Sequence, residues 1–219
     1  AGTVREAFGI WLNRNGGWER VRPEHALDTF GDALAGGDVD GDGKRDALIG
    51  TQVPGMRMTL LLGDGRAYRP AELRSVPLDA LVSAVALHDF DGDGRDEPLA
   101  AALAVADGRW CASLQHVSKP ARGDERYTVL FGEASRDPFV AIVFGDVAHT
   151  GRSDDIVAVR ANGGALVFRR ERGRFVRDID IAPPPRYAHC QAFDARLAPL
   201  ARGAQLIVSY AGDDDGSGG

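Results

Sequence analysis

The sequence is poor in cysteine and in lysine. Its 219 residues include two cysteines, Cys111 and Cys190, and two lysines, Lys44 and Lys119. Two cysteines are compatible with one disulfide or with two buried thiols, so they do not define the redox compartment. The net charge is −6 and the arginines form no basic cluster. Because binding to nucleic acid requires concentrated positive charge, we expect no nucleic-acid partner.

The chain also lacks long hydrophobic runs and familiar catalytic motifs. No apolar stretch approaches the roughly 20 residues that cross a bilayer, so we expect no transmembrane segment. No signal peptide is visible and the first residue is Ala1 rather than Met, which is typical of a processed or excised segment. No Gly-x-Ser-x-Gly elbow, P-loop or dinucleotide fingerprint occurs, which favours a non-catalytic role.

What the sequence does contain is a repeat. Each unit has an apolar run that ends in Asp, then a polar loop rich in Gly and Asp, then an aliphatic run. The loops begin at Asp38, Asp89 and Asp146, with an eroded fourth copy at Asp194, so successive units are 51, 57 and 48 residues apart. That period is close to the roughly 40–50 residues of a four-stranded propeller blade. The short runs between turns, without a long helical period, indicate an all-β chain.

We therefore expect a β-propeller of four-stranded blades, because one small sheet cannot bury both of its faces alone. The expected parts are a half-blade at 1–30, blades at about 31–78, 79–135 and 136–185, a half-blade at 186–211, and a flexible tail at 212–219.

Two arrangements of the half-blades remain open. In a closed ring of four blades, residues 206–208 would pair with residues 10–12. In a fragment of a larger propeller, the two half-blades would belong to different blades.

The loops have the spacing of a calcium site. Calcium takes six to eight oxygen ligands, and alternate residues of a tightly coiled loop can point inward together. In the first loop we expect ligands from the carboxylates of Asp38, Asp40 and Asp42, the carbonyl of Lys44 and the carboxylate of Asp46. Gly41 and Gly43 would permit the turns, because glycine tolerates positive φ.

The second loop repeats this set. Its expected ligands are Asp89, Asp91, Asp93, the Arg95 carbonyl and Glu97. Three carboxylates within five residues repel one another strongly unless a cation is present, so we expect about two bound Ca²⁺ ions. An EF-hand is excluded, because its twelfth position would be Ile49 or Ala100 instead of Glu and the flanking segments are strand-like.

The third loop is degenerate. It keeps Asp146 and Asp154, but Ala148 and Thr150 replace the middle carboxylates. We expect the turn to persist without a metal ion.

These loops resemble those of FG-GAP/VCBS repeats, which occur in integrin α-subunit propellers and in many bacterial secreted proteins. The likeness is carried by residues 37–50, 89–99 and 144–159, and by the turn-like segment 13–18. The resemblance implies that each loop joins the innermost strand of a blade to the second strand, and that its calcium is structural. It also implies a secreted, periplasmic or cell-surface protein.

Two functional classes follow. The first is a propeller that binds a protein or glycan or acts as a scaffold, which is the reading we favour. The second is the propeller domain of a secreted enzyme, such as a polysaccharide lyase or hydrolase, with its site in the central channel. Trp11, Trp18 and Trp110 could form a sugar-stacking surface, but at strand positions we expect them in the cores of blades.

Overall fold

The regular structure of the described residues is β. The computed structural model describes residues 10–21, 31, 33–53, 58–71, 80–117, 127–147, 149–185, 190–200 and 203–211. The expected tail at 212–219 lies outside these residues. The elements in the described ranges are strands, which confirms the all-β class. Within the same ranges, no helix is long and apolar enough to cross a membrane.

Sixteen strands are described. They are β1 (Ile10–Arg14), β2 (Gly17–Val21), β3 (Ala33–Gly37), β4 (Asp46–Gly50), β5 (Thr59–Gly63), β6 (Tyr68–Ala71), β7 (Leu81–His88), β8 (Glu97–Ala106), β9 (Arg109–Val117), β10 (Tyr127–Ala134), β11 (Phe139–Gly145), β12 (Asp155–Arg160), β13 (Ala165–Glu171), β14 (Arg174–Ile181), β15 (Gln191–Leu200) and β16 (Gly203–Ala211).

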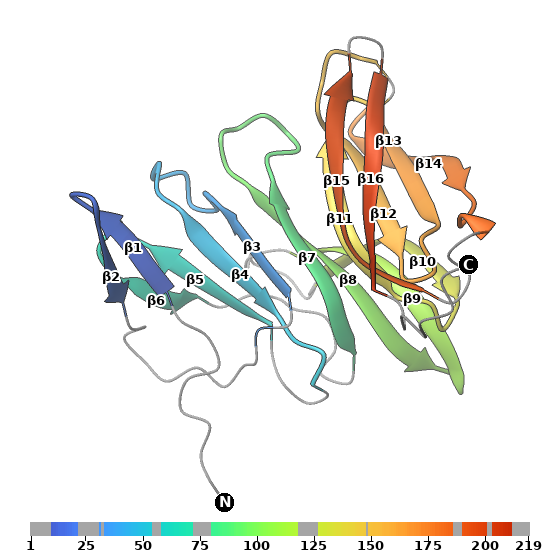
Figure 1. Cartoon of the computed structure of the whole chain (residues 1–219), viewed down its shortest axis with the longest axis horizontal. Coiled ribbons are helices and arrows are strands. Elements are labelled where there is room, and N and C mark those ends of the chain that lie inside the picture. The colour runs from blue at the N-terminus through green and yellow to red at the C-terminus, as the bar shows by residue number, and fades with distance from the viewer. Residues whose placement is uncertain are drawn as a thin grey trace, which may run out of the picture.

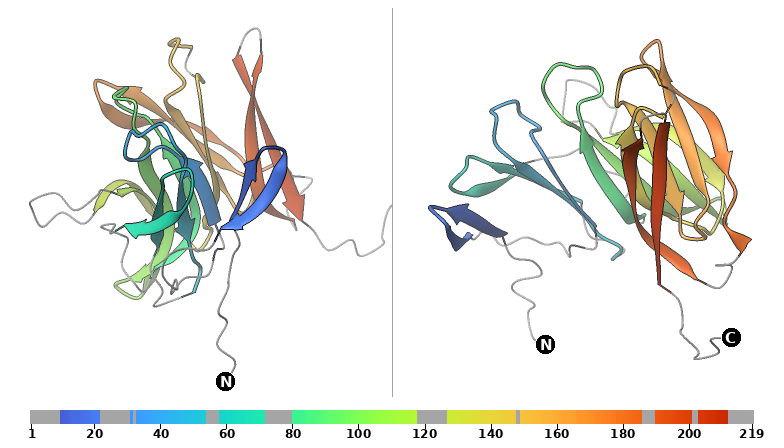
Figure 2. Two further views of the ribbon diagram at one scale, coloured as in Figure 1. Left: turned by 90° about the vertical axis from the view of Figure 1, so that its left-hand side faces the viewer. Right: turned by 45° about the horizontal axis from the view of Figure 1, so that its top comes forward.

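These strands form five antiparallel units in chain order. The first sheet is β3–β6, the second is β7–β10 and the third is β11–β14, and each pairs its strands in sequence. The N-terminal hairpin is β1–β2 and the C-terminal hairpin is β15–β16. The units are arranged like an opened fan (Figures 1 and 2), with β3 next to β7, β7 next to β11 and β11 next to β15. Each four-stranded sheet lies inside one of the ranges expected for a blade.

The second sheet is buried on both faces because it lies between two neighbours. Successive residues of a strand point to opposite faces. In β8, Leu99 and Ala101 therefore pack into the core shared with the third sheet. Ala100 and Ala102 pack into the core shared with the first sheet. This is why β8 is apolar at consecutive positions and not alternating, and its small alanines allow the sheets to stack closely.

The C-terminal hairpin continues the stack on one face. Ala192 and Ala195 pack with Val157 and Val159 of β12 in a third core. Asp194, the expected start of a fourth loop, lies instead inside β15 and pairs with Ser209. The prediction of an eroded loop at Asp194 is wrong, because the strand runs on to Leu200 without a break.

The ring is open in this structure. Among the described strands, β16 pairs only with β15, and β1 pairs only with β2. The pairing of residues 206–208 with residues 10–12 is therefore not formed, and Figure 1 shows the N-terminal hairpin far from β15–β16. Of the two arrangements that the sequence allowed, the closed four-bladed ring is not the one seen. Cys111 and Cys190 are both free thiols.

Candidate metal centre

The acidic loops occupy equivalent places in the three sheets. Residues 38–45 join β3 to β4, residues 89–96 join β7 to β8, and residues 146–154 join β11 to β12. In each sheet the loop thus follows the first strand, and the three loops lie toward the same side of the molecule (Figure 1).

The first carboxylate organises the first loop. Asp38 accepts hydrogen bonds from the backbone N–H groups of Gly41 (2.8 Å), Asp42 (3.1 Å) and Gly43 (2.8 Å). Gly41 and Gly43 have φ of 78° and 79°, a conformation that residues with a Cβ adopt at a cost. The alternation of Asp and Gly therefore curls the backbone around one carboxylate, as expected from the sequence.

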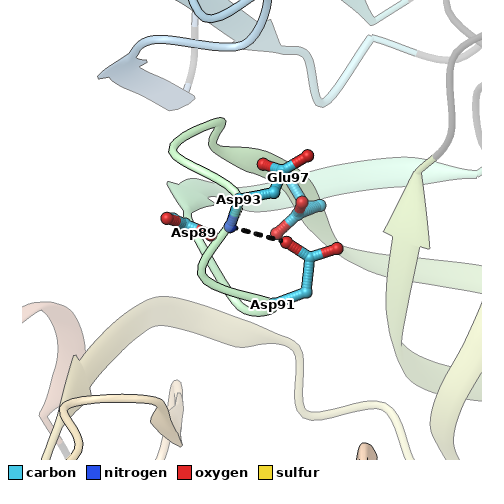
Figure 3. A group of neighbouring side chains, drawn as sticks. All are labelled: Asp89, Asp91, Asp93 and Glu97. Atoms are coloured by element: carbon cyan, nitrogen blue, oxygen red, sulfur yellow. Dashed lines mark hydrogen bonds between the residues drawn. The ribbon is translucent and has the colours of Figure 1, made fainter.

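The second loop has the same local structure. Asp89 accepts hydrogen bonds from Gly92 (2.7 Å) and Gly94 (2.9 Å), and both glycines have positive φ. The curl brings together carboxylate oxygens of Asp89, Asp91, Asp93 and Glu97, which lie within 4.8 Å of one another (Figure 3). The dashed line in Figure 3 marks the bond from the Asp93 N–H to Asp91 Oδ1, at 3.1 Å.

The first loop gathers three carboxylates. Oxygens of Asp38, Asp40 and Asp42 also lie within 4.8 Å of one another. Lys44 is bound to Asp42 twice, through its backbone N–H (2.8 Å) and through Nζ (2.9 Å). This ammonium lowers the pKa of Asp42, and the carboxylate raises the pKa of Lys44. The expected ligand role of the Lys44 and Arg95 carbonyls stays a prediction.

The two loops differ at the last expected ligand. Asp46 is 1% exposed and stands outside the first carboxylate group. One of its oxygens accepts the N–H of Val39 (2.7 Å) and the other accepts the N–H of Gly63 (2.8 Å). Glu97 is one methylene longer: it accepts the N–H of Phe90 (2.7 Å) and still joins its loop's group. Asp46 therefore ties the loop to the sheet, and Glu97 does this and also reaches the carboxylates.

Burial and neighbouring acids act on both of these side chains. Desolvation is the main cause that raises the pKa of Asp46 and of Glu97 above the ordinary values. The charges of Asp89, Asp91 and Asp93 raise the pKa of Glu97 further, whereas the N–H of Phe90 lowers it. The ionised form of Glu97 is thus disfavoured where it stands, and a cation among the four carboxylates would reverse that balance.

The third loop keeps the curl with one residue more. Asp146 accepts N–H groups of Thr150 (2.6 Å) and Gly151 (2.8 Å), and His149 takes the left-handed conformation at φ 57°. Gly145 pairs with Asp155, which lies nine positions after Asp146. In the first sheet the equivalent Gly37 pairs with Asp46, which lies eight positions after Asp38. Asp155, 1% exposed, therefore stands at the end of the third loop, at the place that a loop as long as the first would give to Asp154.

Asp154 is paired with arginine side chains. It is 6% exposed and forms ion pairs with Arg152 (2.9 Å) and Arg170 (3.6 Å). Ala148 lies outside the described residues. The Asp154–Asp155 doublet was the sequence signal for the extra residue, since either acid could have aligned with the end of the loop.

A groove runs along the first strands of the sheets. It encloses about 830 Å³ and is lined mainly by β3, β7, β11 and β15. Its charged residues are Arg136, Asp137, Asp194 and Arg196, of which Arg196 is paired with Asp194. Burial raises the pKa of Asp137, and an Asn162 N–H at 3.2 Å from its Oδ1 acts in the opposite direction.

The N-terminal hairpin carries exposed aromatic side chains. Trp11 is 53% exposed and Trp18 is 71% exposed, so the expectation that they lie in a blade core is wrong for both. The register pairs Trp11 with Arg20 and Asn13 with Trp18, which puts all four residues on one face of the hairpin. The Arg20 guanidinium lies 5.7 Å from the centre of the Trp11 ring. Trp110, on the second sheet, is 36% exposed.

The donor set of the second loop suits a hard cation. It offers carboxylate oxygens only, with no sulfur or imidazole, and calcium prefers such oxygen ligands. No curated protein matches the chain. Residues 38–99 match a family model described as an FG-GAP-like repeat, and this stretch begins with the first loop and contains the whole of the second. The segment from 38 to 99 is therefore an FG-GAP-like repeat, as its resemblance to that family implied.

Proposed function

We propose that this chain is a calcium-stabilised β-propeller module of a secreted, periplasmic or cell-surface protein, and that it binds a protein or glycan or acts as a scaffold. The observation that supports calcium most strongly is the second loop, where four carboxylates lie within 4.8 Å of one another. Like charges at this spacing destabilise the folded chain unless a cation or protons neutralise them. The first loop is the second proposed site, with its three carboxylates.

Calcium should stabilise the protein by mass action. A ligand that binds only the folded state, at 100 times its Kd, adds about 2.7 kcal/mol to the free energy of unfolding. For a chain of this size that corresponds to a rise of about 5–10 °C in Tm. Thermal unfolding in millimolar calcium and in chelator measures this difference, and an equal Tm in both would contradict the proposal.

Single variants assign the ions to loops. Asp40→Ala and Asp91→Ala should each remove one of two bound ions in calorimetric titration. Asp146→Ala should leave the count unchanged, because the third loop lacks the middle carboxylates. More than two specific ions in the parent protein would contradict the assignment. Asp178→Asn is the control for the loss of one negative charge elsewhere on the surface, since Asp178 lies in the third sheet in an ion pair with Arg169.

The exposed tryptophans support a glycan as one class of ligand. Trp11 and Trp18 present aromatic surface on one face of the N-terminal hairpin, beside Asn13 and Arg20 as polar groups. Aromatic faces with adjacent hydrogen-bonding groups suit the apolar and polar sides of a sugar ring. Binding to a panel of immobilised oligosaccharides should fall at least tenfold in Trp18→Ala and remain in Trp110→Ala. Equal binding by both variants would rule out the hairpin face.

The enzyme alternative depends on the groove. A cluster of histidine, arginine and carboxylates there would favour it, but the described residues that line the groove include no histidine, and two of its four charged residues are paired with each other. We therefore keep the binding role as the proposal. Turnover of polysaccharides by the chain that is lost in Asp137→Asn, with the fold intact, would favour the lyase or hydrolase alternative.

A further inference from the structure

Asp96, an acid outside both expected ligand sets, joins the second loop to the first. Its Oδ2 accepts the backbone N–H of Asp38 at 2.7 Å. Its own backbone N–H donates to the carbonyl oxygen of Asp38, also at 2.7 Å. Both backbone groups of Asp38 are thus held by one residue that lies 58 positions away, in the loop of the neighbouring sheet.

The surrounding residues leave room for this contact. A Cβ on Gly37 would overlap Asp96 Oδ2 and lie 2.9 Å from Leu87 Cβ, so a larger residue there would push Asp96 away. A Cβ on Gly41 would lie 3.0 Å from Nε of Arg95, which shows that the Arg95 side chain lies against the first loop. Two consecutive residues of the second loop therefore pack on the first.

One end of this contact is a proposed metal ligand, and the other end lies next to one. Asp38 supplies the carboxylate around which the first loop curls. Asp96 stands between Asp93 and Glu97, whose carboxylates belong to the second group. A cation that fixes the second loop will therefore also fix Asp96, and with it the backbone of Asp38.

The junction of the second and third loops is built differently. The ring of His88 stacks on Phe144, with centroids 4.3 Å apart and planes 8° apart, and His88 also bonds to the backbone of Ser153. Among the described contacts, the reciprocal acid–backbone pair occurs between the first two loops. These are the two loops that retain three or more clustered carboxylates.

We infer that Asp96 is a positioning residue that couples the two loops, so that a cation bound in either one raises the affinity of the other. The inference rests on the proposed calcium binding. Because coupling between sites is reciprocal, both loops must gain by the same factor. The side-chain bond of Asp96 to the Asp38 N–H, which Asp96→Ala removes, sets a coupling of about tenfold, the effect of one hydrogen bond to a charged group.

Calorimetric calcium titrations of the full chain test the coupling. The Kd of the first loop is measured in the parent and in Asp91→Ala, where the second loop is disabled, and we expect about tenfold weaker binding in the variant. With Asp96→Ala added to both proteins, this tenfold difference should disappear. Asp96→Asn keeps an oxygen acceptor for the Asp38 N–H and should retain most of the difference. Asp178→Asn, with one charge removed elsewhere, should retain all of it.

A metal-free measurement separates this inference from the proposed function. In chelator, the amide of Asp38 should exchange with solvent at least tenfold faster in Asp96→Ala than in the parent, and Asp96→Asn should be intermediate. If neither loop binds calcium, the proposed function fails, and unchanged exchange at Asp38 would then overturn the positioning role as well. If both loops bind calcium but the first-loop Kd is the same with and without Asp91, the coupling is refuted. Equal losses in Asp96→Asn and Asp96→Ala would show that the charge, not the bond to Asp38, carries the effect, and would also refute it.

Discussion

Replacing Asp46 separates a structural carboxylate from a metal ligand. The sequence assigns Asp46 to the first calcium loop, but the structure places it below the loop, where its two oxygens hold the N–H groups of Val39 and Gly63. Asp46 is 1% exposed, and both donor residues are also buried. Water therefore has little access to replace the carboxylate in an Asp46→Ala variant.

The expected cost follows from those two bonds. A buried donor left without an acceptor costs about 1–3 kcal/mol, so two of them cost about 2–6 kcal/mol. Burial also raises the pKa of Asp46, so the native fold already bears a cost for the charged form, which the variant avoids. We therefore expect Asp46→Ala to lower the free energy of unfolding by about 2–4 kcal/mol at pH 7.

Urea unfolding, in chelator and in calcium, measures this loss. Asp64→Ala is the matched control, because Asp64 also accepts two backbone N–H groups, from Arg66 and Ala67, both at 2.7 Å, but at an exposed turn. Water can satisfy those donors, so the control should lose much less stability than Asp46→Ala. The loss in Asp46→Ala should be present in chelator. If Asp46→Ala costs no more than Asp64→Ala there and instead removes a bound ion, Asp46 is a ligand and the structural argument is refuted.

Three further outcomes are expected. In chelator, Glu97→Gln should be at least as stable as the parent at pH 7. The pKa of Glu97 is raised in the fold, so ionisation of Glu97 destabilises the native state above that pKa. The stability advantage of the variant should therefore shrink as the pH falls through the raised pKa. A growing advantage at low pH would contradict this sign. Phe168→Ala should cost about 3–5 kcal/mol in urea unfolding, because Phe168 is 1% exposed in the core between the second and third sheets; a loss below about 1 kcal/mol would show that this core is loosely packed. The pKa of His88, followed by NMR, should lie below 6.5, because burial of the imidazole outweighs the nearby carboxylates. The stability that neutral His88 contributes should be lost as the pH falls below 6.5. A titration midpoint above 6.5 would contradict the effect of burial.

The acidic loops were predictable because their geometry is local. The turn at Asp38 depends on Gly41 and Gly43, which lie within five residues of it, and both glycines adopt the positive φ that the motif requires. The same short-range pattern brings Asp89, Asp91 and Asp93 together in the second loop. Alternating and consecutive apolar residues likewise indicated strands, and the repeat of about 50 residues indicated several equivalent sheets.

The errors arose where the environment of a residue depends on another sheet. Trp11 and Trp18 are typical core residues by type, but the hairpin that carries them leaves their common face exposed. The third loop contains an extra residue, so pairing across the sheet, not the count along the chain, put Asp155 at its end. Asp194 resembled a loop start because of its neighbours, yet pairing with Ser209 keeps it within a strand.

The all-β class, the repeat and the curl of each loop could thus be predicted before the fold was known, because they follow from spacing and backbone preference over a few residues. The burial of Asp46 beneath its loop and the contact of Asp96 with Asp38 in the loop of the neighbouring sheet depend instead on the tertiary structure. These contacts span from 7 to 58 residues and form only when strands pair and sheets stack. The angle and register of that stacking are set by the summed packing of the cores between the sheets, which no short segment of the sequence encodes.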